Sequence, residues 1–164
     1  MTSSSTQDLV SQLAGALLKK QWHLSTAESC TGGLVAAAIT ELAGSSDWFE
    51  RGYVTYSNSA KSEDINVSQE LIAQHGAVSD QVARAMAIGA KQNSNSDIAL
   101  SITGIAGPTG GSIEKPVGTV CFAWILANNA TYSETKLFSG NRQEIRAQAC
   151  DFSLKRLLEL LLIQ

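Results

Sequence analysis

The segment HLSTAESCTGGLVAAAITEL, residues 23–42, changes from a strand pattern to a helix pattern across a pair of glycines. Its first five residues are typical of a short buried strand, and residues 34–42 are apolar on nearly every side and poor in bulky side chains. A helix of that composition packs closely on a sheet. A strand, a glycine-containing loop and a buried helix, in this order, are the unit from which α/β folds are built.

The rest of the chain continues this alternation. Helices are predicted at residues 6–20, in short pieces over 58–74, at 79–93 after the N-cap Ser79, and after Asn141, where Glu144 completes a capping box. Strands are predicted at GYVTYS (52–57), DIALSIT (97–103), GTVCFAWIL (118–126) and TYSETKLF (131–138). The last two, separated by ANNA, indicate an antiparallel hairpin. We therefore predict a single three-layer α/β/α domain over residues 1–164, with a mixed, partly antiparallel sheet.

Composition restricts the classes of function. With 164 residues, 44% of them hydrophobic, the chain is long enough for one domain with a real core and too short for two. A net charge of −3, without a run of Lys or Arg, argues against a nucleic-acid partner. The three cysteines and two histidines lack the spacing of metal ligands, so we expect no metal and no cofactor. Neither end reads as a signal peptide or a membrane span, which predicts a cytoplasmic protein without membrane contact.

Ser29 lies where the first predicted strand passes into the loop before the helix. Its hydroxyl could point outward while the N–H groups of the next residues face the same space, an arrangement that supplies a nucleophile and an oxyanion hole. Alternatively, Ser29 merely caps the helix, and Gly32 and Gly33 merely allow tight packing. The G-x-S-x-G pattern of hydrolases is absent because Ala27 replaces its first glycine. The residues alone leave both interpretations open.

Cys30 is a rival nucleophile. A thiol is intrinsically more nucleophilic than a hydroxyl, and the start of a helix would lower its pKa. Adjacent side chains point apart at such a turn, so only one of Ser29 and Cys30 can face a site. Free cysteines more often serve in packing than in chemistry, and we favour that role for all three.

Lys61 favours chemistry at Ser29. If Asn58 caps the helix that follows, Lys61 lies in the first turn, where its charge opposes the helix dipole. A partly desolvated lysine there could act as a general base toward a serine hydroxyl, although a solvated surface lysine is the commoner case. Tyr56 could relay a proton or hold the lysine through its phenol, or could pack in the core. Glu28 either holds the loop by hydrogen bonds or is solvated.

Two further segments provide candidate ligand contacts. The strand that ends at Thr103 and Gly104 lets the backbone approach a ligand at the carboxyl ends of the strands. The loop that follows matches neither of the common glycine-rich phosphate motifs. Arg142 and Arg146, at the start of the last helix, could bind a phosphate together with that helix N-terminus, or could form surface pairs with nearby carboxylates.

Four segments together resemble the CinA C-terminal domain family: TAESCTGG (26–33), WFERGYVTYSNSAK (48–61), AQHGAVS (73–79) and ALSITGIAGPTGGSIEKPVGTV (99–120). The resemblance runs from about residue 9 to residue 158. It implies an amidase that hydrolyses the carboxamide of nicotinamide mononucleotide to nicotinate mononucleotide and ammonia. It also implies a cytoplasmic homodimer that acts on this small molecule without a metal.

The resemblance further implies a Ser-Lys mechanism, with Ser29 as nucleophile, Lys61 as general base and Tyr56 assisting. Substrate contacts are then expected at the loop after Ser29, at the end of the strand before residue 105 and at the last helix, namely Cys30, Thr31, Gly32, Gly33, Thr103, Gly104 and Arg142. One alternative is a non-catalytic nucleotide-binding partner protein in competence or the DNA-damage response. Another is a thiol amidase that uses Cys30.

Overall fold

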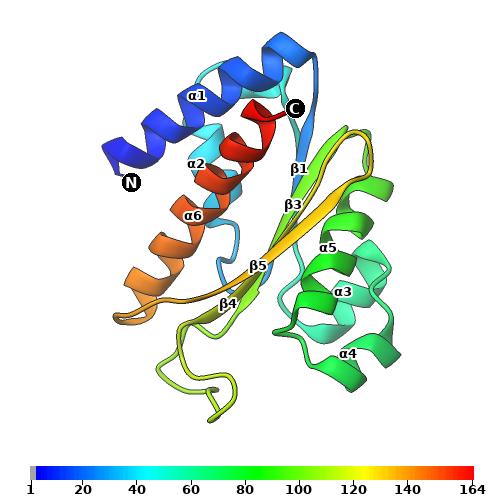
Figure 1. The fold of residues 1–164 in the computed structure, drawn as a ribbon, viewed down its shortest axis with the longest axis vertical. Coiled ribbons are helices and arrows are strands. Elements are labelled where there is room, and N and C mark those ends of the chain that lie inside the picture. The colour runs from blue at the N-terminus through cyan, green and yellow to red at the C-terminus, as the bar shows by residue number, and fades with distance from the viewer. Residues whose placement is uncertain (1–2) are drawn as a thin grey trace.

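The computed structural model describes residues 3–164. Its helices are α1 (Ser4–Lys20), α2 (Leu34–Thr40), α3 (Asn58–Ile65), α4 (Gln69–His75), α5 (Asp80–Gln92) and α6 (Arg142–Leu162), with a short 3-10 helix, η1, at Ser45–Asp47. Its strands are β1 (Leu24–Glu28), β2 (Phe49–Val54), β3 (Ile98–Gly104), β4 (Thr119–Ile125) and β5 (Thr131–Leu137). Helices α1, α2 and α6 cover one face of the sheet, and α3, α4 and α5 cover the other (Figure 1). The predicted three-layer α/β/α arrangement is confirmed.

The five strands form one sheet in the order β2-β1-β3-β4-β5. Strand β1 is parallel to both β2 and β3, whereas β4 runs antiparallel to β3 and to β5. The carboxyl ends of β1, β2 and β3 therefore meet at one edge of the sheet. There the chain leaves β1 for α2 on one face and leaves β2 for α3 on the other, which is the point where α/β proteins place their ligands.

Each face of the sheet has its own hydrophobic core. The core under α1, α2 and α6 contains the large aromatic residues. In it, the rings of Phe122 and Phe152 pack edge to face, with their centroids 4.8 Å apart. The core under α5 is built from smaller residues, and it includes the inward-facing Val82, Met86 and Ala90 that the helical spacing predicts. At Gly89 a side chain would collide with the carbonyl oxygen of Ile65, so α3 packs directly on the backbone of α5.

Local capping signals determine several boundaries. The predicted cap Ser79 and the predicted capping box of Asn141 and Glu144 are both present. Two expectations need correction. The strand predicted at GYVTYS spans Phe49–Val54 instead, and the cap of α3 is Ser57 rather than Asn58. The strand ends early because the Ser57 hydroxyl accepts a hydrogen bond from the backbone of α3, which turns the chain out of the sheet.

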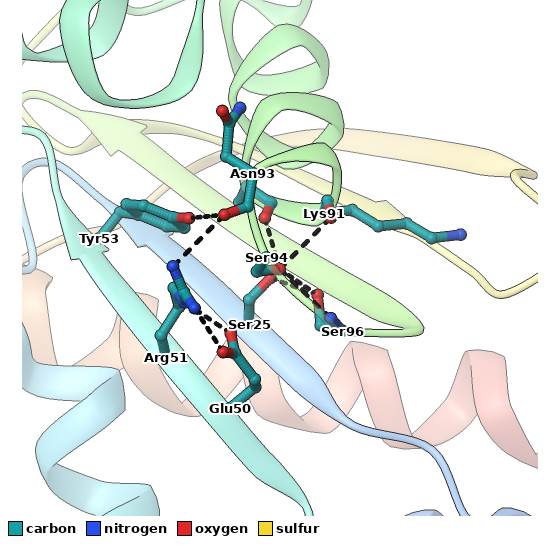
Figure 2. A network of polar contacts seen from close by, with 9 residues as sticks. Ser25, Glu50, Arg51, Tyr53, Lys91, Asn93, Ser94 and Ser96 are labelled. Atoms are coloured by element: carbon teal, nitrogen blue, oxygen red, sulfur yellow. Dashed lines mark hydrogen bonds and ion pairs between the residues drawn. The ribbon is translucent and has the colours of Figure 1, made fainter.

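A polar network closes the opposite end of the sheet, near the amino end of β1 (Figure 2). The hydroxyl of Ser25 is hydrogen-bonded to that of Ser96 at 2.8 Å, and Ser96 is bonded in turn to Ser94 at 2.6 Å. The backbone carbonyl of Asn93, at the end of α5, accepts the phenol of Tyr53 at 2.6 Å. These polar side chains join the end of α5 to the strands. Within residues 3–164, no helix combines the length and apolar composition that crossing a membrane requires.

Candidate active site

The loop from Ser29 to Gly33 connects β1 to α2 and leaves the sheet at a fixed point. The N–H of Ser29 donates to the carbonyl oxygen of Ile102 at 2.9 Å, which ties the start of the loop to β3. Gly32 and Gly33 have φ values of 58° and 98°, in the left-handed region that side-chain-bearing residues rarely adopt. The two glycines therefore permit the tight turn that places Ser29 at the carboxyl end of β1.

The side chain of Glu28 holds the end of this loop, where α2 begins. The carboxylate is fully buried, with one oxygen accepting the N–H of Val35 at 2.9 Å and the other accepting the N–H of Ala36 at 3.1 Å. It supplies the cap that Gly33, the N-cap residue of α2, cannot provide. The loop-holding interpretation of Glu28 is confirmed, and the capping interpretation of Ser29 is wrong.

Lys61 meets Ser29 across the carboxyl ends of β1 and β2. Its side chain is 1% exposed, and its Nζ lies 3.1 Å from the Oγ of Ser29, which is itself 8% exposed. Nζ also donates to the carbonyl oxygens of Thr55, Tyr56 and Ser57, at 3.0, 3.2 and 3.4 Å. Lys61 is therefore a buried lysine rather than a solvated one.

Burial sets the protonation behaviour of this lysine. The lost water around the ammonium lowers the pKa of Lys61 from its ordinary value of 10.5. Its carbonyl acceptors belong to the turn between β2 and α3, so the amine is held in place whether or not it is charged. A neutral amine within hydrogen-bond distance of a hydroxyl can take its proton, which is the requirement for a general base.

Cys30 is unsuited to nucleophilic chemistry. Its side chain is buried in the core under α1, α2 and α6. Burial raises the pKa of the Cys30 thiol to about 12, and the nearby Glu28 adds to that effect. Burial also raises the pKa values of Cys121 and Cys150. The helix start does not lower the pKa of Cys30 as expected, because the apolar surroundings outweigh it; the predicted packing role is confirmed for all three cysteines.

Two of the five backbone N–H groups in the loop from Ser29 to Gly33 are bonded to backbone carbonyl oxygens. The N–H of Gly32 donates to the carbonyl oxygen of Ser29 at 3.0 Å, and the N–H of Ser29 is held by Ile102. In the described part of the chain, the N–H groups of Cys30, Thr31 and Gly33 have no hydrogen-bond acceptor in another residue. Of these three residues only Cys30 lines the cavity beside Ser29, so its N–H is the candidate oxyanion donor.

A cavity of about 230 Å³ opens beside Ser29. Seven of the predicted site residues line it, namely Ser29, Cys30, Tyr56, Lys61, Thr103, Gly104 and Arg142. The structure does not place Thr31, Gly32 or Gly33 on its wall. The hydroxyl of Thr103 donates to the carbonyl oxygen of Ala77 at 2.9 Å, so this residue holds the wall of the cavity together. Within residues 3–164, no group of three or more His, Cys, Asp or Glu residues could hold a metal ion.

Tyr56 and Arg142 form the rim of the cavity. Tyr56 is 60% exposed, and its phenol oxygen accepts a hydrogen bond from Nη2 of Arg142 at 3.2 Å. Nη1 of Arg142 donates to the carbonyl oxygen of Gly107 at 2.7 Å. The contact of Tyr56 with Lys61 is made by its backbone carbonyl, in place of the phenol that the sequence suggested. The alternative prediction, that Tyr56 packs in the core, is wrong, because β2 ends at Val54 and the side chain of Tyr56 is exposed.

Arg146 lies outside this cavity, on the other side of the loop. Its Nε donates to the carbonyl oxygen of Cys30 at 3.1 Å, and its Nη2 donates to that of Thr31 at 3.0 Å. For Arg146, as for Arg142, we predict a phosphate contact or a surface ion pair, and its bonds to the loop carbonyls are neither. Cys30 is 116 residues away along the chain, so no local signal could reveal it.

A family model for the CinA C-terminal domain matches residues 6–161. The chain belongs to the CinA C-terminal domain family. A curated relative of this family, the nicotinamide-nucleotide amidohydrolase PncC of Escherichia coli strain K12, is 52% identical over 96% of this chain and 95% of its own length. The protein of the same name from Enterobacter agglomerans is 48% identical, over 96% of both chains.

Solved structures and longer relatives agree with this family assignment. The crystal structure of a competence/damage inducible protein from Agrobacterium tumefaciens has a TM-score of 0.94 and 40% identity, covering 98% of both chains. A CinA-like protein of Syntrophobacter fumaroxidans is 44% identical over 97% of this chain, which corresponds to 38% of that protein. The CinA C-terminal domain therefore occurs both nearly alone and within longer proteins.

Proposed function

We propose that residues 1–164 work as one amidase domain that hydrolyses the carboxamide of nicotinamide mononucleotide to nicotinate mononucleotide and ammonia. The observation that carries the proposal is the buried amine of Lys61, 3.1 Å from the hydroxyl of Ser29 at the wall of a cavity. Relatives named nicotinamide-nucleotide amidohydrolase, 48–52% identical over 96% of this chain, support the reaction and the substrate.

The first half of the proposed reaction acylates Ser29. Neutral Lys61 takes the hydroxyl proton while Oγ bonds to the amide carbon, and the carbonyl electron pair moves to oxygen. The N–H of Cys30, which lines the cavity, is the donor for this oxyanion. Lys61 then gives its proton to the amide nitrogen, the carbon-nitrogen bond breaks, and ammonia leaves behind an ester on Ser29.

The second half repeats the proton transfers with water. Lys61, neutral again, takes a proton from water as the water oxygen attacks the ester carbon. The carbon-oxygen bond to Ser29 then breaks, and Lys61 returns the proton to Oγ. Every proton is carried by Lys61, which the carbonyl oxygens of Thr55 and Tyr56 hold at a fixed distance from Ser29.

Arg142 is the proposed contact for the phosphate of the substrate. It lies at the rim of the cavity, anchored by Gly107, and its guanidinium carries the charge and the planar donors that phosphate prefers. Tyr56 is proposed to assist twice, through its carbonyl on Lys61 and through its phenol on Arg142. Together the two rim residues place the nucleotide so that its carboxamide reaches Ser29.

We also propose that the enzyme works as a cytoplasmic homodimer on this small molecule, without nucleic acid. Exposed apolar side chains at the ends of α1 and α6, Leu18, Leu162 and Ile163, support a contact between copies. The net charge of −3 supports the absence of a nucleic-acid partner. Light scattering of the purified protein tests the assembly, and a monomer mass at micromolar concentration would contradict it.

The test of the function is ammonia release from nicotinamide mononucleotide by the purified chain, with the product identified by chromatography and mass. We expect stoichiometric ammonia and nicotinate mononucleotide. Nicotinamide and its riboside, which lack the phosphate, should react far more slowly. Absence of ammonia from all three, with direct binding of the nucleotide, would overturn the amidase and support the non-catalytic binding protein.

A further inference from the structure

Asn58 is the first residue of α3 and lines the cavity that contains Ser29. Lys61 follows it three positions later, and residues three apart lie on the same face of a helix. Lys61 is buried, whereas Asn58 is exposed to solvent. The face of α3 that supplies the proposed base therefore also presents a carboxamide side chain to the same cavity.

The side chain of Asn58 is free to bind a ligand. Within residues 3–164, its amide has no hydrogen-bond partner, and only its backbone carbonyl is used, by the hydroxyl of Ser62. The other hydroxyl, amine and guanidinium groups on the cavity wall are already hydrogen-bonded within the protein: Ser29 to Lys61, Tyr56 to Arg142, and Thr103 to Ala77. Asn58 thus offers one oxygen acceptor and two N–H donors to whatever enters the cavity.

The proposed reaction determines which arm of the substrate carboxamide faces Asn58. The carbonyl oxygen turns toward the N–H of Cys30, on the loop that leads to α2. The nitrogen must lie within reach of Lys61, which gives it a proton before ammonia leaves. Helices α2 and α3 cover opposite faces of the sheet (Figure 1), so the two arms of the planar amide point to opposite sides of Ser29. The nitrogen arm is the one on the side of α3.

We propose that Oδ1 of Asn58 accepts a hydrogen bond from the carboxamide nitrogen of the substrate, which selects a primary amide and directs its nitrogen toward Lys61. This role rests on the proposed amidase function. An ester of the same acid, and the carboxylate product, have no hydrogen to donate to Oδ1. Asn58 carries no proton in the reaction, because every proton transfer still runs through Lys61.

Kinetics on an amide and an ester isolate this bond. Asn58→Leu should lower kcat/KM for nicotinamide mononucleotide by about tenfold, the size of one hydrogen bond. For the methyl ester of nicotinate mononucleotide, which releases methanol in place of ammonia, the same variant should stay within about twofold of wild type. The ester oxygen has no hydrogen, so no bond to Asn58 is lost. An equal fall for both substrates, or no fall for the amide, would overturn the proposal.

Gln69 provides the matched control. It is the first residue of α4, is exposed, and lines a neighbouring groove together with Asn58, but it does not line the cavity that contains Ser29. Gln69→Leu therefore removes a carboxamide from the same helical position outside the site. We expect unchanged kcat/KM for both substrates. A fall for the amide as large as that of Asn58→Leu would show that the effect does not depend on contact with the substrate, and would overturn the proposal.

Calorimetric binding in the Ser29→Ala background separates this proposal from the identity of the reaction. Asn58→Leu should raise the Kd of nicotinamide mononucleotide by about tenfold. Asn58→Asp keeps an acceptor oxygen and removes the donor nitrogen, so it should raise that Kd by no more than about threefold. For nicotinate mononucleotide, Asn58→Asp should raise the Kd by about tenfold or more, because two carboxylates then face each other.

The two sets of measurements fail in different ways. If wild type releases no ammonia, the proposed function fails while the Kd values still decide the role of Asn58. A weaker binding of nicotinamide mononucleotide by Asn58→Asp than by Asn58→Leu would show that Asn58 donates to the substrate rather than accepts, and would overturn the proposal. Circular dichroism shows whether each variant is folded, and Asn58→Asp carries the test if Asn58→Leu is not.

Discussion

Ser25 and Ser29 lie at opposite ends of β1, both nearly inaccessible to solvent, but in different chemical surroundings. The hydroxyl of Ser25 is bonded to that of Ser96, within the network of Figure 2. The hydroxyl of Ser29 is bonded to the amine of Lys61 and faces a cavity. Burial alone therefore does not make a nucleophile. In the proposed mechanism, Ser29 acts as the nucleophile because it has a titratable partner and room for a substrate.

The lysines repeat this contrast. Lys91 donates to two backbone carbonyl oxygens, those of Leu126 and Ala127, where Lys61 donates to three, and burial lowers the pKa of both lysines. The remaining acceptor of Lys91 is the side chain of Asn129, whereas the remaining acceptor of Lys61 is the hydroxyl of Ser29. The two lysines share a mode of anchoring and differ in whether a hydroxyl at a cavity is within reach.

The largest difference in activity is expected when each serine hydroxyl is removed in turn. Ser29→Ala should lower kcat by roughly 10⁴-fold or more, because a nucleophile and its base act as one unit. Ser25→Ala should leave kcat within about twofold and cost about 1 kcal/mol of unfolding free energy, for one buried hydrogen bond. Ammonia release and urea titration measure the two effects. Comparable activity losses in both variants would show that Ser29 is structural.

The lysine pair gives the next largest effect. Lys61→Met should also lower kcat by roughly 10⁴-fold, since no base remains to take the proton of Ser29. Lys91→Met should leave kcat within about twofold. The same ammonia assay, with circular dichroism to confirm folding, measures both variants. Appreciable activity in folded Lys61→Met would mean that another group, or water, takes the proton.

The pH dependence sharpens the role of Lys61. The base must be neutral, so kcat/KM should rise about tenfold per pH unit on the acid side and level off at the lowered pKa, below 10.5. Stability should follow the same group. Between the lowered folded pKa and the unfolded value near 10.5, the unfolded chain binds more protons, so stability rises with pH.

Lys61→Met is the reference for this measurement. The difference in urea unfolding free energy between wild type and Lys61→Met, followed across that pH range, isolates the contribution of the lysine. A difference that does not change with pH, together with a flat kcat/KM profile, would contradict a lowered pKa at Lys61.

The smallest expected effect concerns Cys30. With a thiol pKa of about 12, the side chain stays protonated at neutral pH, and Cys30→Ala should keep kcat within about threefold. The assay is again ammonia release by the folded variant. Loss of activity with the fold intact would restore the thiol amidase as the mechanism.

Most of the fold follows from local signals in the sequence. The hydroxyl of Ser79 and the pair of Asn141 and Glu144 mark helix starts within three or four residues, so their caps can be predicted without tertiary information. The position of Ser29 is likewise predictable, because it stands at a junction of strand and helix patterns, but the residues alone leave open whether it caps the helix or faces a site. The sequence does not predict the end of β2, because Ser57 and Asn58 are both good N-cap residues and only the tertiary structure shows that Ser57 is the cap.

A single sequence does not reveal the contacts that hold the site residues in place. Whether Glu28 is solvated or capping depends on how α2 returns over β1. The phenol of Tyr56 is hydrogen-bonded to Arg142, 86 positions away along the chain. Arg146 is hydrogen-bonded to the carbonyl oxygen of Cys30, 116 positions away. Such contacts depend on helix packing, and the residue types at these positions have ordinary surface roles in most proteins.

The attachment of the loop to α6 gives the protein a hierarchy of stability. Ser29 and Lys61 are held by the turns at the ends of neighbouring strands, only 32 residues apart, whereas the loop carbonyls depend on a distant helix. A partial opening that detaches the start of α6 would leave the sheet and the Ser29–Lys61 pair in place while releasing the loop. Hydrogen exchange at the loop amides would then follow the docking of α6, and loss of activity would precede loss of the fold.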